Sequence, residues 1–255
     1  MQPMTTSRAL LRSTLPSVSY GPFRLFEAVP WLILAATMRV LAFAGGLIAL
    51  PAIMIANVAL LLAFVIVTWR MVLISNGQSG LGQMGLSQQI RMARTVLLPV
   101  FGLLIVATIV AASSRLVDRP HELMLGFDGI AFDQMSNLGR VWSALVAALL
   151  LLMVLQVDEA SKPSLFRAMR QFADRASWLV PGVLLVAAIS ILLHPVQSWF
   201  RLLIRDMWLH ADIPTSVKGL LSLAYVFSFA TVRLWLTVAI LVFALRQSYR
   251  ARSIA

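Results

Sequence analysis

The chain has 255 residues, of which 60% are hydrophobic and 12% are charged, and its formal net charge is +11. Soluble domains are about 45–50% apolar, so this composition excludes an ordinary soluble protein and predicts an all-α, polytopic transmembrane bundle. The sequence contains no cysteine, which excludes disulfides, thiolate metal sites and thiol chemistry.

Basic residues gather at the ends of the apolar runs. All of them are arginine except Lys162 and Lys218, a bias that suggests a bacterial, GC-rich coding sequence. In this position they are typical of charges that set membrane topology and face anionic lipid. We therefore expect membrane lipids, including anionic ones, as surroundings, and no nucleic-acid partner.

Residues 1–28 form a basic segment that is rich in arginine and serine and has no acid before Glu27. This composition resembles a transit peptide, which makes the mitochondrial inner membrane the alternative location. No signal-type cleavage site precedes an apolar run of the right length. We therefore favour a short cytoplasmic tail and interfacial entry in a bacterial inner-membrane protein, followed by a transmembrane domain over 29–246 and a basic cytoplasmic tail over 247–255.

A helix needs about 20 apolar residues to cross the roughly 30 Å of hydrocarbon in a bilayer. Residues 29–74 form an apolar stretch of about twice that length, which predicts two spans joined near Leu50 and Pro51. Further apolar runs cover 95–113, 141–157, 178–194 and 219–245, which gives about six spans. The alternative has five, with 23–38 lying along the membrane and 40–69 forming one long tilted span.

The distribution of arginine and lysine between these runs predicts the orientation. With the N-terminus inside, the inner loops carry most of the basic residues, while the basic residues outside are diluted by acids. The positive-inside rule then places both termini in the cytoplasm, with loops 116–139 and 195–217 outside.

Two connecting segments have the apolar periodicity of amphipathic helices. In 162–178 the apolar residues recur at helical spacing, and Arg167, Arg170 and Arg175 take the opposite face. In 195–208 Trp199 and its apolar neighbours oppose Arg201 and Arg205. We expect two interfacial helices, one on each surface, although either could also dock a partner. His194 precedes Pro195 and is predicted to end a helix.

Sequence motifs give no catalytic residue. Gly80, Gly82 and Gly85 form a literal GxGxxG, but no strand precedes them, so we interpret the segment as a cytoplasmic loop. His121, His194 and His210 are scattered near the outer edges of the predicted spans. We therefore expect neither an enzyme nor a cofactor or metal site.

Two arginines lie inside predicted spans, where a charged side chain costs roughly 2.5–3.5 kcal/mol on insertion scales. They are Arg39 and Arg233, and no acid lies inside any predicted span. Backbone carbonyls, hydroxyls, Asn57 or water could satisfy them within the bundle. Alternatively, Arg39, Arg233 and Asn57 bind an anionic ligand, a lipid head group or a carboxylate of a partner.

Three stretches carry a resemblance to a known group of proteins: "FRLFEAVPWLILA", "TWRMVL" and "QIRMARTVLLPV". In these, the chain resembles uncharacterised bacterial six-span proteins related to the membrane domain of some glycerophosphodiester phosphodiesterases. The resemblance implies a membrane-embedded accessory or transport role. It carries over no catalytic residue, because the phosphodiesterase part is absent.

Together these features predict a non-catalytic inner-membrane protein that acts as a subunit, assembly factor or lipid-binding scaffold of a larger complex. Its expected partners are lipids and other membrane protein subunits. The alternative function is a transporter or permease component whose 75–94 cytoplasmic loop docks an ATPase.

Overall fold

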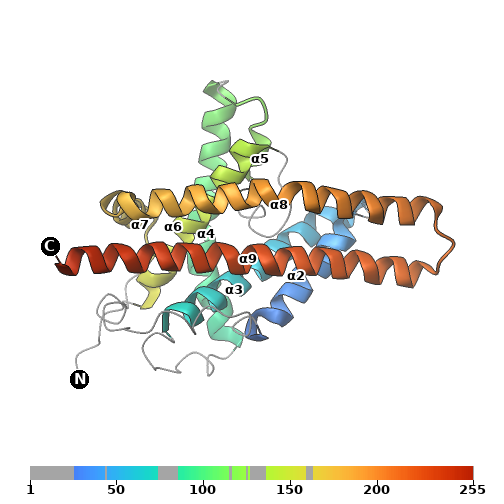
Figure 1. The fold of residues 1–255 in the computed structure, drawn as a ribbon, viewed down its shortest axis with the longest axis horizontal. Coiled ribbons are helices and arrows are strands. Elements are labelled where there is room, and N and C mark those ends of the chain that lie inside the picture. The colour runs from blue at the N-terminus through green and yellow to red at the C-terminus, as the bar shows by residue number, and fades with distance from the viewer. Residues whose placement is uncertain are drawn as a thin grey trace.

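The computed structural model describes residues 26–43, 45–73, 86–114, 117–124, 126, 136–158 and 163–254, and within them every regular element is helical (Figure 1). In chain order the elements are α2 (Val29–Phe43), the short η2 (Gly46–Ile48), α3 (Ala49–Leu73), α4 (Leu86–Ser114), α5 (His121–Met124), α6 (Asn137–Asp158), α7 (Leu165–Asp174), α8 (Ala176–His210) and α9 (Thr215–Ile254). The all-α prediction is confirmed.

Among the residues that the structure describes, five helices are long and apolar enough to cross a membrane, which makes the chain a multi-pass integral membrane protein. They cover Gly46–Thr68, Arg94–Ser114, Asn137–Gln156, Ala176–His210 and Thr215–Tyr249. The first of the six expected spans is absent from this set. Its helix, α2, has only 15 residues, about 22 Å at about 1.5 Å per residue, and so is shorter than the hydrocarbon layer.

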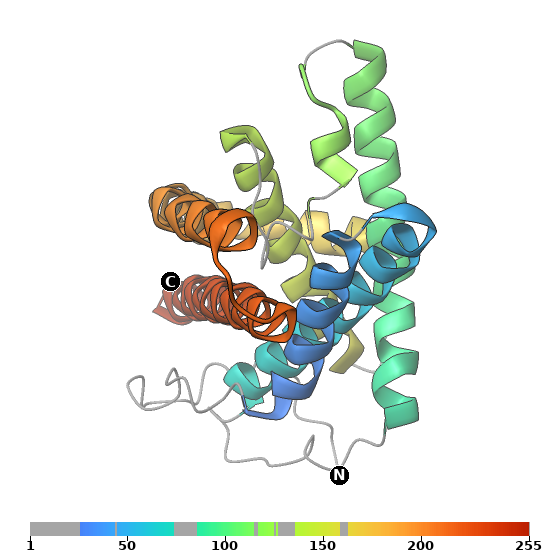
Figure 2. The ribbon, with the colours of Figure 1, turned by 90° about the vertical axis from the view of Figure 1, so that its right-hand side faces the viewer.

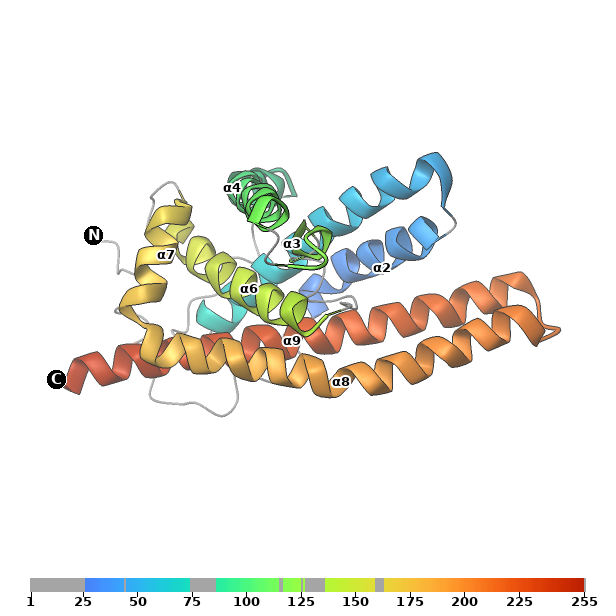
Figure 3. The same ribbon diagram turned by 90° about the horizontal axis from the view of Figure 1, so that it is seen from above.

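The turn between α2 and α3 lies earlier than predicted. The chain reverses at Gly45 and Gly46, whose φ angles are 75° and 71°, a region that glycine adopts without steric cost. Pro51 lies in the first turn of α3, where its missing N–H removes no helical hydrogen bond. The prediction of a joint near Leu50 and Pro51 was therefore wrong by a few residues. The alternative of one long span over 40–69 was also wrong, because α2 doubles back along α3 (Figure 3).

The core is centred on α6, in whose apolar stretch 78% of the residues are buried. Helices α3, α8 and α9 pack around it. The buried share of the apolar stretch is 28% for α8 and only 22% for α4. Most of the apolar residues of these two helices therefore lie on the outside of the bundle.

Helix α4 runs across the hairpin that α8 and α9 form. In Figure 2 the hairpin is seen nearly end-on, while α4 is seen along its length. The buried side chains of α4 include Val96, Val100 and Leu104, so it contacts the bundle with one face. One membrane normal cannot be parallel both to α4 and to the hairpin.

The segment 195–208 is not a separate interfacial helix. Helix α8 continues through Pro195 to His210, and α9 begins at Thr215. Pro195 removes one hydrogen bond from the helix interior, but packing against α9 keeps the helix continuous, since the Tyr225 hydroxyl donates to the Gln197 carbonyl at 3.1 Å. The prediction that His194 ends a helix was wrong for the same reason.

Candidate functional site

Arg233 lies in the interface between α8 and α9 and is 2% exposed. It lines a cavity together with Ser190, Thr237 and apolar side chains of both helices. The space open to the centre of a water molecule is about 10 Å³, and a single water needs roughly 10–15 Å³. In this conformation that space holds about one water molecule.

Asn57 lines a different cavity, between α3 and α4. The neighbours that form it include Leu61, Val100 and Met124, and the space open to the centre of a water molecule is about 20 Å³. The side-chain oxygen of Asn57 is buried and has no hydrogen-bond partner within the described part of the chain. A bound water would satisfy this oxygen, because buried polar groups that lack a protein partner are commonly hydrated.

Arg39 is half-buried on α2 and lines neither of these two cavities. Its helix packs against α3 and α9. The structure therefore does not bring Arg39, Asn57 and Arg233 together in one cavity, because Asn57 faces α4 whereas Arg233 faces α8.

Three contacts set the register of α8 against α9. Near one end Gly182 lies close to Ala244, further along Tyr225 binds Gln197, and near the tip Trp208 Nε1 donates to Ser222 Oγ at 2.9 Å. Arg233 is about 12 Å along α9 from Tyr225, at about 1.5 Å per residue.

Helix α8 carries three exposed tryptophans, and the first two are separated by the thickness of a hydrocarbon layer, while the third, Trp208, is 42% exposed near the hairpin tip. Trp178 is 40% exposed and Trp199 is 57% exposed, and they are about 31 Å apart along the helix. This separation matches the roughly 30 Å of hydrocarbon in a bilayer, and tryptophan is enriched at both membrane interfaces. Beyond Trp199 lie the exposed Arg201 and Arg205.

Helix α7 lies at the Trp178 end of the hairpin and has three faces. Leu165, Ala168 and Phe172 face the bundle. Apolar residues that remain exposed form the second face, and the polar residues Arg167, Arg170 and Asp174 form the third. The apolar side predicted from the sequence therefore consists of two parts, one packed on the bundle and one exposed. Phe172 packs against the core, while Phe166 is 77% exposed.

A network of hydrogen bonds fastens α7 to α6 and α9. Gln156 of α6, 1% exposed, donates to Gln171 Oε1 at 3.2 Å and accepts from the Ser164 backbone N–H at 2.8 Å. Arg175, which joins α7 to α8, donates to the Gln171 carbonyl and to the Tyr249 hydroxyl, both at 3.2 Å. Apart from an amide at the end of an apolar run, nothing in the sequence indicated this network.

A second polar cluster that sequence reasoning missed lies where α5 meets the start of α6. The Glu122 carboxylate is 2% exposed, accepts a hydrogen bond from Ser136 Oγ and pairs with Arg119 at 3.6 Å. Ser136 Oγ in turn accepts from the Gly139 N–H at 3.0 Å, which caps α6. Trp142 Nε1 donates to the Leu123 carbonyl at 2.9 Å. The cluster fastens α5 to the best-buried helix of the bundle.

Comparison with known proteins gives no relative. No protein-family model matches the chain, and no curated protein or solved structure matches it either. The proposed resemblance to the membrane domain of some phosphodiesterases therefore stays a prediction.

Within the part of the chain that the structure describes, no group of three or more His, Cys, Asp or Glu side chains is placed to hold a metal ion. Gly80, Gly82 and Gly85 lie outside the described residues, as does the greater part of the 75–94 segment that was expected to dock an ATPase. The remainder of that segment belongs to α4.

Proposed function

We propose that the chain is a non-catalytic subunit, assembly factor or scaffold of a larger membrane complex, and that the tip of the α8–α9 hairpin contacts its partner. One observation carries this proposal: the hairpin is longer than a bilayer is thick and carries exposed leucines near its tip.

The length of α8 supports this. It has 35 residues, about 52 Å at about 1.5 Å per residue, whereas a bilayer with its head groups measures about 40–45 Å. With the hydrocarbon layer between Trp178 and Trp199, α8 continues for about 16 Å to His210. The tip then passes through the head-group region into the aqueous phase. Figure 1 shows it projecting beyond α2 and α3.

Apolar side chains persist in this projecting part. Leu202 is 60% exposed, and Leu209 and Leu220 are each 65% exposed. Large apolar side chains exposed outside the membrane are typical of a contact with another protein. Charged residues, including Arg205 and Lys218, occur in the same part of the hairpin, as they do in the polar rim of a protein interface.

Purification in mild detergent tests the proposal. We expect a stoichiometric partner polypeptide to accompany the wild-type chain and to be lost from the double variant Leu209→Ala, Leu220→Ala. The matched control is Leu184→Ala, Leu192→Ala, which removes two exposed leucines of α8 between the two tryptophans. Loss of the partner from both double variants, or no partner with the wild type, would contradict the proposal.

The proposed location is a bacterial inner membrane with both termini in the cytoplasm. The excess of arginine at the α7 side and at the end of α9 supports this orientation. A reporter enzyme fused after Ala255 should be active only in the cytoplasm, and external activity would reverse the assignment.

A further inference from the structure

We propose that α7 lies in the plane of the membrane surface and binds the phosphate groups of anionic phospholipids in the leaflet on its own side. This inference does not depend on whether the hairpin tip holds a partner, because it concerns the opposite end of the hairpin.

The direction of α7 is the first argument. It crosses the hairpin near the start of α8 and near the C-terminal end of α9, as Figure 3 shows from above. Only Arg175 separates α7 from α8. When the hairpin crosses the bilayer, α7 is therefore parallel to the surface and at the level of one interfacial tryptophan.

The exposed apolar face of α7 is the second argument. Phe166 is 77% exposed and Met169 is 44% exposed, and Ala173 is exposed on the same side. Their spacing of three and four residues places them on one stripe of the helix. The stripe lies between the face that packs on the bundle and the face that carries Arg167 and Arg170. An interfacial helix has this arrangement, with its apolar side in the acyl chains and its cations among the head groups.

Hydrogen bonds at both ends hold α7 rigidly in this position. Gln156 binds both its N-terminal end at Ser164 and its side chain Gln171. Arg175 fastens its other end to Tyr249 of α9. The exposed stripe and the two exposed arginines therefore have a fixed depth relative to the spans.

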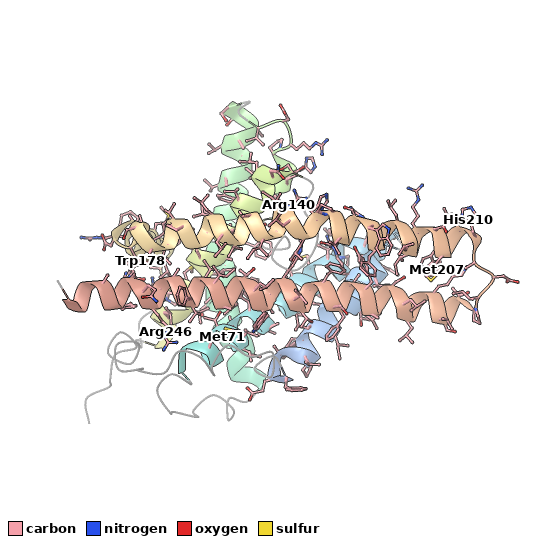
Figure 4. All side chains as sticks on the ribbon, viewed as in Figure 1. Met71, Arg140, Trp178, Met207, His210 and Arg246 are labelled. Carbon is pink, nitrogen blue, oxygen red and sulfur yellow. The ribbon has the colours of Figure 1, made fainter. Side chains whose placement is uncertain are left out.

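The positive charge of α7 indicates that anionic lipid is the ligand of this surface. The ten residues of α7 include two exposed arginines and one acid, Asp174. Arg175 follows directly, with neutral partners at Gln171 and Tyr249. Arg246, at the same end of the hairpin (Figure 4), is buried and therefore adds positive charge nearby without facing the lipid. A basic helix beside an exposed apolar stripe fits the phosphates of anionic lipid, and arginine can bind phosphate in a bidentate manner.

Native mass spectrometry of the full chain tests the proposal. The protein is extracted from bilayers of equal phosphatidylglycerol and phosphatidylcholine, and the ratio of the two retained lipids is measured. Each arginine near an anionic surface changes binding by about fivefold. We expect Arg167→Gln, Arg170→Gln to lower the ratio by at least about fivefold, and Arg167→Lys, Arg170→Lys to restore most of it.

The control is Arg201→Gln, Arg205→Gln, which removes the same charge from the other end of α8. It should leave most of the lipid preference intact. Equal losses in the two glutamine variants would show that the preference follows total charge, and this would overturn the proposal. A wild-type protein without preference, or displacement of the lipid by 10-fold excess inorganic phosphate, would overturn it as well. Circular dichroism checks that each variant is folded, and co-purification of the partner tests the proposed function separately.

Discussion

Arg175 stacks on Tyr249, with its guanidinium carbon 4.8 Å from the centre of the ring, and also donates a hydrogen bond to the hydroxyl of that tyrosine at 3.2 Å. The two residues are far apart in the sequence, and their contact joins the α7–α8 corner to the end of α9. One aromatic side chain thus supplies both a cation–π contact and a hydrogen-bond acceptor.

The two parts of this contact can be separated by substitution. Tyr249→Phe should lower the free energy of unfolding by about 1 kcal/mol, because it removes the acceptor and keeps the ring. Tyr249→Leu should cost about 1 kcal/mol more, because the ring is lost as well. Thermal unfolding in detergent measures both. Equal stability of the two variants would show that the ring contributes nothing.

The close approach of α8 and α9 at Gly182 predicts opposite effects for two glycine substitutions. A Cβ atom on Gly182 would lie 2.9 Å from Ala244 Cβ, whereas one on Gly219 meets nothing within 4 Å. Gly182→Ala should therefore destabilise the hairpin by about 1–3 kcal/mol. Gly219→Ala should be neutral or stabilising by up to about 1 kcal/mol through helix propensity. Both are measured by thermal unfolding, and effects of the same sign would contradict the packing.

The contact of α5 with α6 depends on the space at Gly126. A Cβ atom there would lie 2.5 Å from Trp142 Nε1, so Gly126→Ala should displace the indole and break its hydrogen bond to the Leu123 carbonyl. We expect a loss of about 1–3 kcal/mol, and about 1 kcal/mol for Trp142→Phe, which removes only the hydrogen bond. Chemical denaturation of the purified protein measures both. A Gly126→Ala protein as stable as the wild type would contradict the described geometry.

The three faces of α7 predict distinct environments for labels attached to single cysteines. The natural chain has no cysteine, so each label reports one position. A spin label at Phe166 or Ala173 should be accessible to oxygen dissolved in the lipid, and one at Arg170 should be accessible to a water-soluble relaxation agent. A label at Phe172 should be immobilised, because this residue packs against the core. Water exposure at Phe166 and Ala173 would exclude an interfacial helix.

The small cavity beside Arg233 predicts that this arginine holds no lipid head group. Arg233→Gln and Arg233→Leu should therefore leave the number of retained anionic lipids unchanged in native mass spectra. Loss of lipid from both Arg233 variants would revive the hypothesis of an anionic ligand between α8 and α9, and would mean that the hairpin opens to admit it.

Membrane insertion and the approximate spans were accessible from the sequence, because both depend on the length of an apolar run. The runs at 95–113 and 141–157 correspond to the structural segments Arg94–Ser114 and Asn137–Gln156. Crossing a hydrocarbon layer requires a local property of the chain, namely about 20 consecutive apolar residues. The helical spacing of the apolar residues in α7 was also predictable, because such a spacing is likewise a local property of the chain.

Contacts between helices determine the features that the sequence alone does not predict, such as the helix that a polar side chain faces. Asn57 and Arg233 are both polar residues within apolar runs, so the sequence does not distinguish their surroundings. In the structure Asn57 faces α4 and Arg233 faces α8. Pro195 was expected to interrupt a helix, but packing against α9 outweighs its local effect. Likewise, only the tertiary structure shows that Phe172 packs partly buried against the core while Phe166 is exposed. Helical periodicity gives the apolar side of a helix, but the share of that side covered by protein depends on the neighbouring helices.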